Sequence, residues 1–124
     1  MKTLLDDYYR IDSRTDAGDD VLFSVTLLPE CCVYAGHFPG NPVSPGVCNI
    51  QMIKECAVQL TGEPLFLGYI SQCRLSAVIT PQTTPHLQIR MQLSEADNVY
   101  NVCATVYDDT TTYMNFKGEL TPVE

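Results

Sequence analysis

The chain has 124 residues, of which 45% are hydrophobic, and seven Lys and Arg against 15 Asp and Glu give a net charge of −8. This length predicts a single domain, 1–124, that buries a core without crosslinks. The acidic balance argues against partners that need clustered Lys and Arg, namely nucleic acid and anionic membranes. No apolar run is long enough to predict a membrane span.

Six cysteines are spread along the sequence: Cys31, Cys32, Cys48, Cys56, Cys73 and Cys103. Met1 leads into Lys2 and acidic residues rather than an apolar signal segment, so we expect a cytoplasmic protein. There, reduced and mostly buried thiols are favoured over disulfides. No Cys-x-x-Cys motif occurs and the only histidines are His37 and His86, so we expect no metal and no cofactor.

The first part of the chain predicts two strands and then a stiff loop. Residues 4–14 are consistent with a short edge strand, a polar turn surrounds Gly18, and residues 21–28 alternate as in a half-buried strand. The loop that follows holds three prolines and three glycines within eleven residues, together with His37. Because Pro and Gly fix unusual backbone angles, such a loop presents specific groups at specific places.

Residues 47–60 predict a helix that is buried over more than half of its circumference. Apolar residues recur at i, i+3, i+7 and i+10 from Ile50, between a Pro-Gly start and a Thr-Gly stop. Gln51, Glu55 and Gln59 form a polar line along this helix at i, i+4 and i+8.

Four strands with short turns are predicted after the helix. Residues 65–79 form one long strand or two strands broken near Gly68, and residues 87–93, 100–106 and 111–120 form the others. A single apolar helix needs a surface that surrounds it. We therefore predict an α+β hotdog fold, in which a curled antiparallel sheet wraps around one long central helix. The open edges of such a sheet favour a homodimer with a continuous sheet.

The residues at the start of the helix suggest a chemical role. The first N–H groups of a helix lack internal partners and lie at the positive end of its dipole, so a carbonyl or oxyanion fits at Gly46. His37 titrates near neutrality and is a candidate general base. The plainer alternatives are that His37 only bonds to backbone, and that Gln51 and Glu55 face solvent or a subunit contact.

The loop resembles the H-F-P-G-x-P-x-x-P-G-V signature of 3-hydroxyacyl-acyl-carrier-protein dehydratases of the FabZ/FabA kind. Residues 37–47 read HFPGNPVSPGV and match all eight fixed positions. The resemblance implies that His37 removes the proton alpha to the thioester and that the Gly46 amide, beside Val47, holds the thioester carbonyl. It also implies substrate contacts for Phe38 and, in a weaker match further along the chain, for Arg74.

The chain departs from this family at the catalytic acid. The resemblance places a carboxylic acid, supplied by the partner subunit, fourteen residues after the histidine, where this chain has Gln51. Glutamine hydrogen-bonds a hydroxyl group but does not transfer a proton as a carboxyl group does. Glu55 stands four residues on, where the family usually has glutamine, so it is a candidate substitute on the same helix face.

Three functions remain open from the sequence. The first is a dehydratase, or dehydratase-like protein, acting on 3-hydroxyacyl thioesters in fatty-acid or polyene synthesis. The second is a hotdog thioesterase, and the third is a non-catalytic subunit that partners an active dehydratase. The expected partners are an acyl thioester on acyl carrier protein or coenzyme A and a second hotdog subunit, in a homodimer, a heterodimer or a higher oligomer.

Overall fold

One helix and six strands make up the part of the chain that the structure describes, residues 3–31 and 44–123 of a computed structural model. The strands form one antiparallel sheet in the order β1-β2-β4-β5-β6-β3. Their bounds are β1 Tyr9–Ala17, β2 Asp20–Leu27, β3 Leu65–Leu75, β4 His86–Ala96, β5 Val99–Tyr107 and β6 Thr112–Pro122. The helix, α2, covers Gly46–Thr61.

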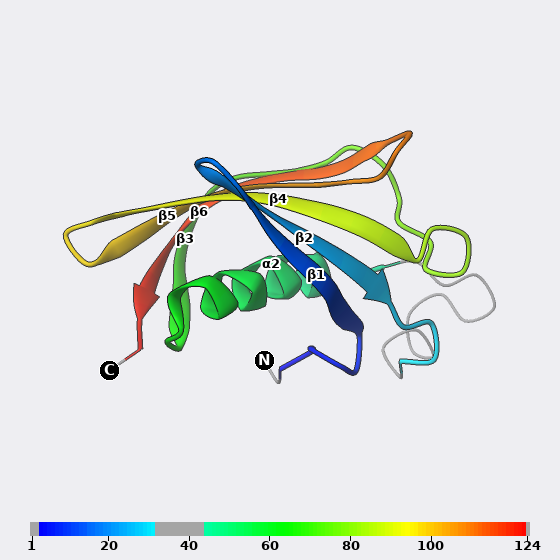
Figure 1. Cartoon of the computed structure of the whole chain (residues 1–124), viewed down its shortest axis with the longest axis horizontal. Helices are drawn as coiled ribbons and strands as arrows, with labels where there is room; N and C mark the ends of the chain where they lie inside the picture. The colour runs from blue at the N-terminus through cyan, green and yellow to red at the C-terminus, as the bar shows by residue number, and fades with distance from the viewer. Residues whose placement is uncertain (1–2, 32–43, 124) are drawn as a thin grey trace.

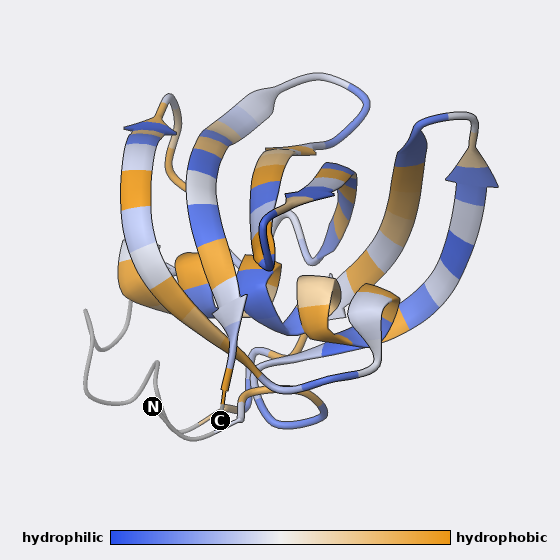
Figure 2. Ribbon diagram, turned by 90° about the vertical axis from the view of Figure 1, so that its left-hand side faces the viewer, coloured by the Kyte–Doolittle hydropathy of each residue, from blue (hydrophilic) through white to orange (hydrophobic). Residues whose placement is uncertain are grey.

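The sheet curls around α2, which lies along its concave side (Figure 1). Apolar and polar bands alternate along the strands (Figure 2), as a period of two residues requires when only one face is buried. In β2 the inward-facing positions are Phe23, Val25 and Leu27, all at most 1% exposed. This is the predicted hotdog fold.

The helix packs its apolar arc against the sheet and ends where the sequence predicts. Met52, Ile53, Cys56 and Ala57 are at most 1% exposed. Gly62 adopts a left-handed conformation with φ of 74°, and its N–H donates to the carbonyl of Val58. A residue without a Cβ takes this conformation at little cost, so the glycine stops the helix.

Two segments differ from the sequence-based expectation. The region predicted as one strand to residue 79, or as two strands broken near Gly68, is a single strand, β3, that ends at Leu75 and shifts register on either side of Tyr69. The first strand begins later than predicted, at Tyr9, because residues 4–8 form a turn. It is the predicted edge strand, since β1 and β3 are the two outermost strands.

The prediction of mostly buried cysteines is only half right. Cys48 and Cys56, both on α2, are buried, whereas Cys73 and Cys103 are exposed on strands. Cys103 faces outward because it alternates with the inward-facing Val102 and Ala104. No helix within residues 3–31 and 44–123 has the length and apolar character needed to cross a membrane.

Candidate active site

The amino end of α2 leaves two backbone donors open. Pro45 precedes the helix in an extended conformation and no side chain caps it. Its carbonyl accepts from the N–H groups of Cys48 and Asn49, each at 3.1 Å. Within the described residues, the N–H groups of Gly46 and Val47 have no backbone acceptor outside the helix. Two unpaired donors at the positive end of a helix dipole suit an anionic or carbonyl oxygen.

A cavity of about 290 Å³ lies at this end of the helix. Its wall comprises Ser44, Gly46 and Asn49 together with the chain that follows β3, namely Leu75, Ser76, Ala77, Val78 and Ile79. A Cβ on Gly46 would lie 3.2 Å from Leu75 Cδ1. Glycine at this position therefore keeps open the space next to the helix amides.

Asn49 is a site residue that our sequence reasoning missed. Its side chain is 2% exposed, lines the cavity, and accepts a hydrogen bond of 2.7 Å from the Tyr8 hydroxyl group. The signal was its spacing, because Asn49 precedes the buried Met52 and Ile53 by three and four residues and so shares their face. A polar residue on the apolar face of a helix needs a partner.

Halfway along α2, Glu55 is 7% exposed and accepts four hydrogen bonds. Its Oε2 accepts from Leu4 N at 2.8 Å and Gln51 Nε2 at 2.8 Å. Its Oε1 accepts from Leu5 N at 2.9 Å and the Tyr9 hydroxyl group at 2.9 Å. The predicted polar line is therefore not a solvated face at this position, and the carboxylate fastens the amino-terminal segment to the helix.

Burial around Glu55 also suppresses the acidity of its neighbours. Burial first, and then the Glu55 carboxylate, raises the pKa of Cys56 to about 12. Burial, the Cys56 thiol and the Glu55 carboxylate together raise the pKa of Tyr9 above its ordinary value. Both groups therefore stay neutral at physiological pH, and Tyr9 acts as a hydrogen-bond donor.

The other predicted site residues are placed as follows. His37 and Phe38 lie outside the described residues. Gly46 and Val47 begin the helix, and Gln51 stands one turn further on without lining the cavity next to Gly46. Arg74 is exposed on β3 and makes no ion pair in the described part of the chain. The structure thus brings Gln51 and Glu55 together and keeps both apart from the Gly46 cavity.

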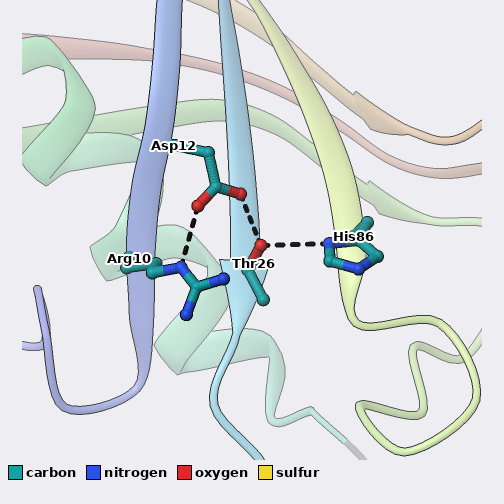
Figure 3. Close-up of polar contacts among 4 residues, drawn as sticks. All are labelled: Arg10, Asp12, Thr26 and His86. Carbon is teal, nitrogen blue, oxygen red and sulfur yellow. Dashed lines mark hydrogen bonds and ion pairs between the residues drawn. The ribbon is translucent and has the colours of Figure 1, made fainter.

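A second polar cluster links β1, β2 and β4 (Figure 3). Asp12 accepts from Arg10 Nε at 2.8 Å and from the Thr26 hydroxyl group, whose oxygen lies 3.0 Å from His86 Nδ1. The Thr26 hydrogen bond and then Arg10 hold the pKa of Asp12 below its usual value. The threonine stands between the acid and the histidine, so this is not the order in which a histidine activates a nucleophile. The cluster fastens three strands together.

A larger cavity, of about 490 Å³, lies away from the helix terminus. Its wall consists mainly of polar side chains of β4, β5 and β6, such as Lys117 and Glu119, together with Asp19 from the β1–β2 turn and Ser71 of β3. No group of three or more His, Cys, Asp or Glu side chains suited to a metal ion occurs within residues 3–31 and 44–123. Of these two cavities, the smaller one has Gly46 and the open helix amides at its edge, which is the arrangement expected for carbonyl chemistry.

Comparison with protein families gives a match over most of the chain. The model of the ApeI-like family, described as ApeI dehydratase, matches residues 13–115. The 3-hydroxyacyl-[acyl-carrier-protein] dehydratase FabZ of Levilactobacillus brevis is 37% identical over 65 residues, which cover 47% of this chain and 44% of that protein. FabZ of Lactiplantibacillus plantarum is 27% identical over 89 residues, or 66% and 60% of the two chains. The chain thus matches about half of the length of these relatives.

Solved structures share the fold at low sequence identity. A chain of the dehydratase heterocomplex ApeI:P from Xenorhabdus doucetiae superposes with a TM-score of 0.71 at 19% identity, covering 90% of this chain and 96% of that one. The dehydratase domain from the CurJ module of Curacin polyketide synthase gives a TM-score of 0.58 at 13% identity, covering 92% of this chain and 42% of that one. These likenesses establish the architecture.

Proposed function

Because the chain belongs to the ApeI-like family of dehydratases, we propose that it acts on 3-hydroxyacyl thioesters. In this proposal His37 is the base, and the amides of Gly46 and Val47 hold the thioester carbonyl. The observation that carries it is the junction between the HFPGNPVSPGV loop and a helix terminus with two open amides, where Gly46 borders a cavity. In this proposal the oxyanion donors follow directly after the segment that supplies the base.

The proposed reaction is removal of water across the alpha and beta carbons. His37 takes the proton from the alpha carbon, and negative charge develops on the thioester oxygen next to the helix amides. The electron pair then forms the alpha–beta double bond while the beta C–O bond breaks. The departing hydroxyl group needs a proton to leave as water, which is the task of the family's acid.

The source of that proton decides between two versions of the proposal. Gln51 has no acidic proton, and all four hydrogen-bond partners of Glu55 are donors that already occupy its oxygens. In the first version, the proton that His37 has removed returns to the hydroxyl group. In the second version, the chain is a subunit that becomes active only with a different hotdog chain, which supplies a carboxylic acid. The engaged Glu55 favours the second version.

A second hotdog subunit fits against β3. This outermost strand exposes large apolar side chains, with Phe66 60%, Tyr69 58% and Ile70 40% accessible. Unpaired edge strands with exposed apolar residues invite pairing with another chain. We propose that β3 pairs with β3 of a second subunit, either another copy or the acid-supplying chain. The ApeI:P complex of Xenorhabdus doucetiae is itself described as a dehydratase heterocomplex.

The substrate carrier is proposed to approach near Arg74. This exposed cation stands on β3 next to Leu75, which lines the cavity at the helix amides. Its guanidinium group suits the phosphate that links a pantetheine arm to acyl carrier protein or forms part of coenzyme A. Because the net charge is −8, an acidic carrier protein would bind through such a local contact and not through overall attraction.

The deciding experiment follows enoyl thioester formation and thiol release from a 3-hydroxyacyl thioester. Enoyl product that disappears in His37→Ala and persists in His86→Ala supports the dehydratase, with the second histidine as the matched control. Thiol release without enoyl product would identify a thioesterase. Activity that appears only with Gln51→Glu, or with an added acid-bearing hotdog chain, supports the subunit version. No product under any of these conditions would refute the proposed function.

A further inference from the structure

The hydrogen bonds of Glu55 determine which atom of Gln51 is available. An ionised carboxylate has only acceptor sites, about four of them. The N–H groups of Leu4 and Leu5, the Tyr9 hydroxyl group and the Gln51 amide occupy both of its oxygens, two donors to each. The Gln51 contact is therefore the NH₂ group, because an amide oxygen facing this carboxylate would place two acceptors 2.8 Å apart.

We infer that Glu55 is a positioning residue that fixes Gln51 as a hydrogen-bond acceptor for the 3-hydroxyl group of the substrate. With Nε2 held by Glu55, the Oε1 atom is the free end of the amide, and it accepts no hydrogen bond within the described part of the chain. This inference rests on the proposed function and the proposed pairing of two copies, in which residue 51 of one subunit reaches the beta carbon of an acyl group held at Gly46 of the other. It deepens that proposal by assigning the recognition of the hydroxyl group.

The surroundings of Glu55 keep its side chain from turning away. Leu4 and Leu5 donate from the backbone, so releasing the carboxylate would strip two main-chain N–H groups of their acceptor. The Tyr8 hydroxyl group holds the same segment to Asn49, two residues before Gln51 on the helix. Leu5 also forms a β-bridge with Tyr9. The N–H groups of Leu4 and Leu5 and the Tyr9 hydroxyl group therefore hold the Glu55 carboxylate in place. The carboxylate in turn holds the Gln51 amide.

An acceptor at this position has a defined chemical consequence. The Gln51 oxygen accepts the O–H of a 3-hydroxyacyl group, so it distinguishes that group from a saturated acyl chain. It gives no proton to the departing oxygen. In a pair of identical subunits the site therefore selects the hydroxylated substrate through Gln51, and the proton for the leaving group is the one that His37 has removed.

The test is the binding preference for a 3-hydroxyacyl pantetheine thioester over the saturated acyl pantetheine of the same length. It is measured in the full chain with His37→Ala, which prevents turnover. One hydrogen bond to an amide predicts about three- to tenfold tighter binding of the hydroxy compound. Glu55→Gln should reduce this ratio to about one while leaving the affinity for the saturated compound unchanged. Gln59→Glu, at the exposed end of the same helix line, should leave both affinities unchanged.

The outcomes separate the inference from the proposed function. Equal binding of the two compounds by the parent protein overturns the inference alone. Failure of both compounds to bind refutes the proposed substrate, and the inference with it. A Glu55→Gln variant that loses affinity for both compounds equally would show a merely structural role for Glu55 and also overturns the inference.

A measurement without any substitution at Glu55 covers the case in which that variant does not fold. In the wild-type protein, the side-chain NH₂ protons of Gln51 should exchange with solvent more slowly than those of Gln59. They should also show a shifted amide resonance, because only the Gln51 group donates to a carboxylate. Equal exchange and unshifted resonances would overturn the proposed positioning.

Discussion

Replacing Glu55 by alanine tests how strongly this carboxylate stabilises the fold. The change removes the acceptor from four donors, of which Leu4 N and the Tyr9 hydroxyl group are bonded to it in buried surroundings. A buried donor left without its partner costs about 1–3 kcal/mol. The Leu5 and Gln51 donors are only part-buried and water can reach them. We therefore expect the free energy of unfolding to fall by about 2–6 kcal/mol.

This loss is a large share of the total of about 5–15 kcal/mol that holds a domain together. The measurement is urea unfolding, in which the midpoint of Glu55→Ala should fall by roughly 1–3 M with the slope unchanged. Gln59→Ala, on the same helix but exposed, serves as the control and should stay within about 0.5 kcal/mol of wild type.

Amide hydrogen exchange locates the effect. In Glu55→Ala the N–H groups of Leu4 and Leu5 should lose protection, while those in the middle of β5 should change only in line with global stability. If Glu55→Ala unfolds at the same urea concentration as Gln59→Ala, the four hydrogen bonds contribute nothing net and the reasoning fails.

Three further predictions concern other sites. The Tyr113 hydroxyl group, followed by the backbone of the adjoining turn, lowers the pKa of Asp108 to about 2. A carboxyl group with a depressed folded-state pKa stabilises the protein above its unfolded pKa and ceases to do so as pH falls through about 2. Asp108→Asn should thus lower the urea midpoint at pH 7 but not near pH 2, and a pH-independent difference would contradict this. Burial raises the pKa of Cys56 to about 12, whereas Cys103 is exposed. A thiol reagent at pH 8 should therefore label Cys103 in the native protein and Cys56 only after unfolding, and mass spectrometry would detect the difference. Gly46→Ala should change the free energy of unfolding by less than about 1 kcal/mol. It should nevertheless weaken acyl pantetheine binding, measured by calorimetry, at least about tenfold. Unchanged binding would exclude the helix amides as the carbonyl site.

The architecture was predictable because its signals are local. The apolar period of the helix, its Gly62 stop and the alternation in β4 and β5 each depend on neighbours within a few residues. The short turn predicted between the strands at 87–93 and 100–106 is a tight hairpin in which Asp97 and Asn98 both have positive φ, at 53° and 63°. Asp and Asn tolerate this conformation better than most residues, so composition alone marks the turn.

The parts that were predicted incorrectly depend on contacts between distant segments. Alternation in residues 65–79 gives the period of a strand but not its place at the edge of the sheet, where Tyr69 and Leu75 remain 58% and 57% exposed. Where β3 ends is determined by residues after Leu75, since the N–H of Ser76 donates instead to the carbonyl of Tyr113. The assignment of His37 as the base stays a prediction that rests on the loop motif.

Relative to the FabZ-like pattern, the acid and the glutamine are exchanged between positions 51 and 55. The hydrogen bonds that hold the amino-terminal segment to the helix give a reason for this exchange. The N–H groups of Leu4 and Leu5 find their acceptor about fifty residues away in sequence, in the carboxylate at position 55, which also accepts from the Tyr9 hydroxyl group. A second carboxylate at position 51 would then lie within hydrogen-bonding distance of Glu55, where two like charges cannot both persist and one would retain a proton. A neutral amide that donates to Glu55 removes this conflict. In the proposed site, glutamine at the acid position is thus a residue type that a structural Glu55 accommodates, and it offers an acceptor where the FabZ-like pattern has a proton donor.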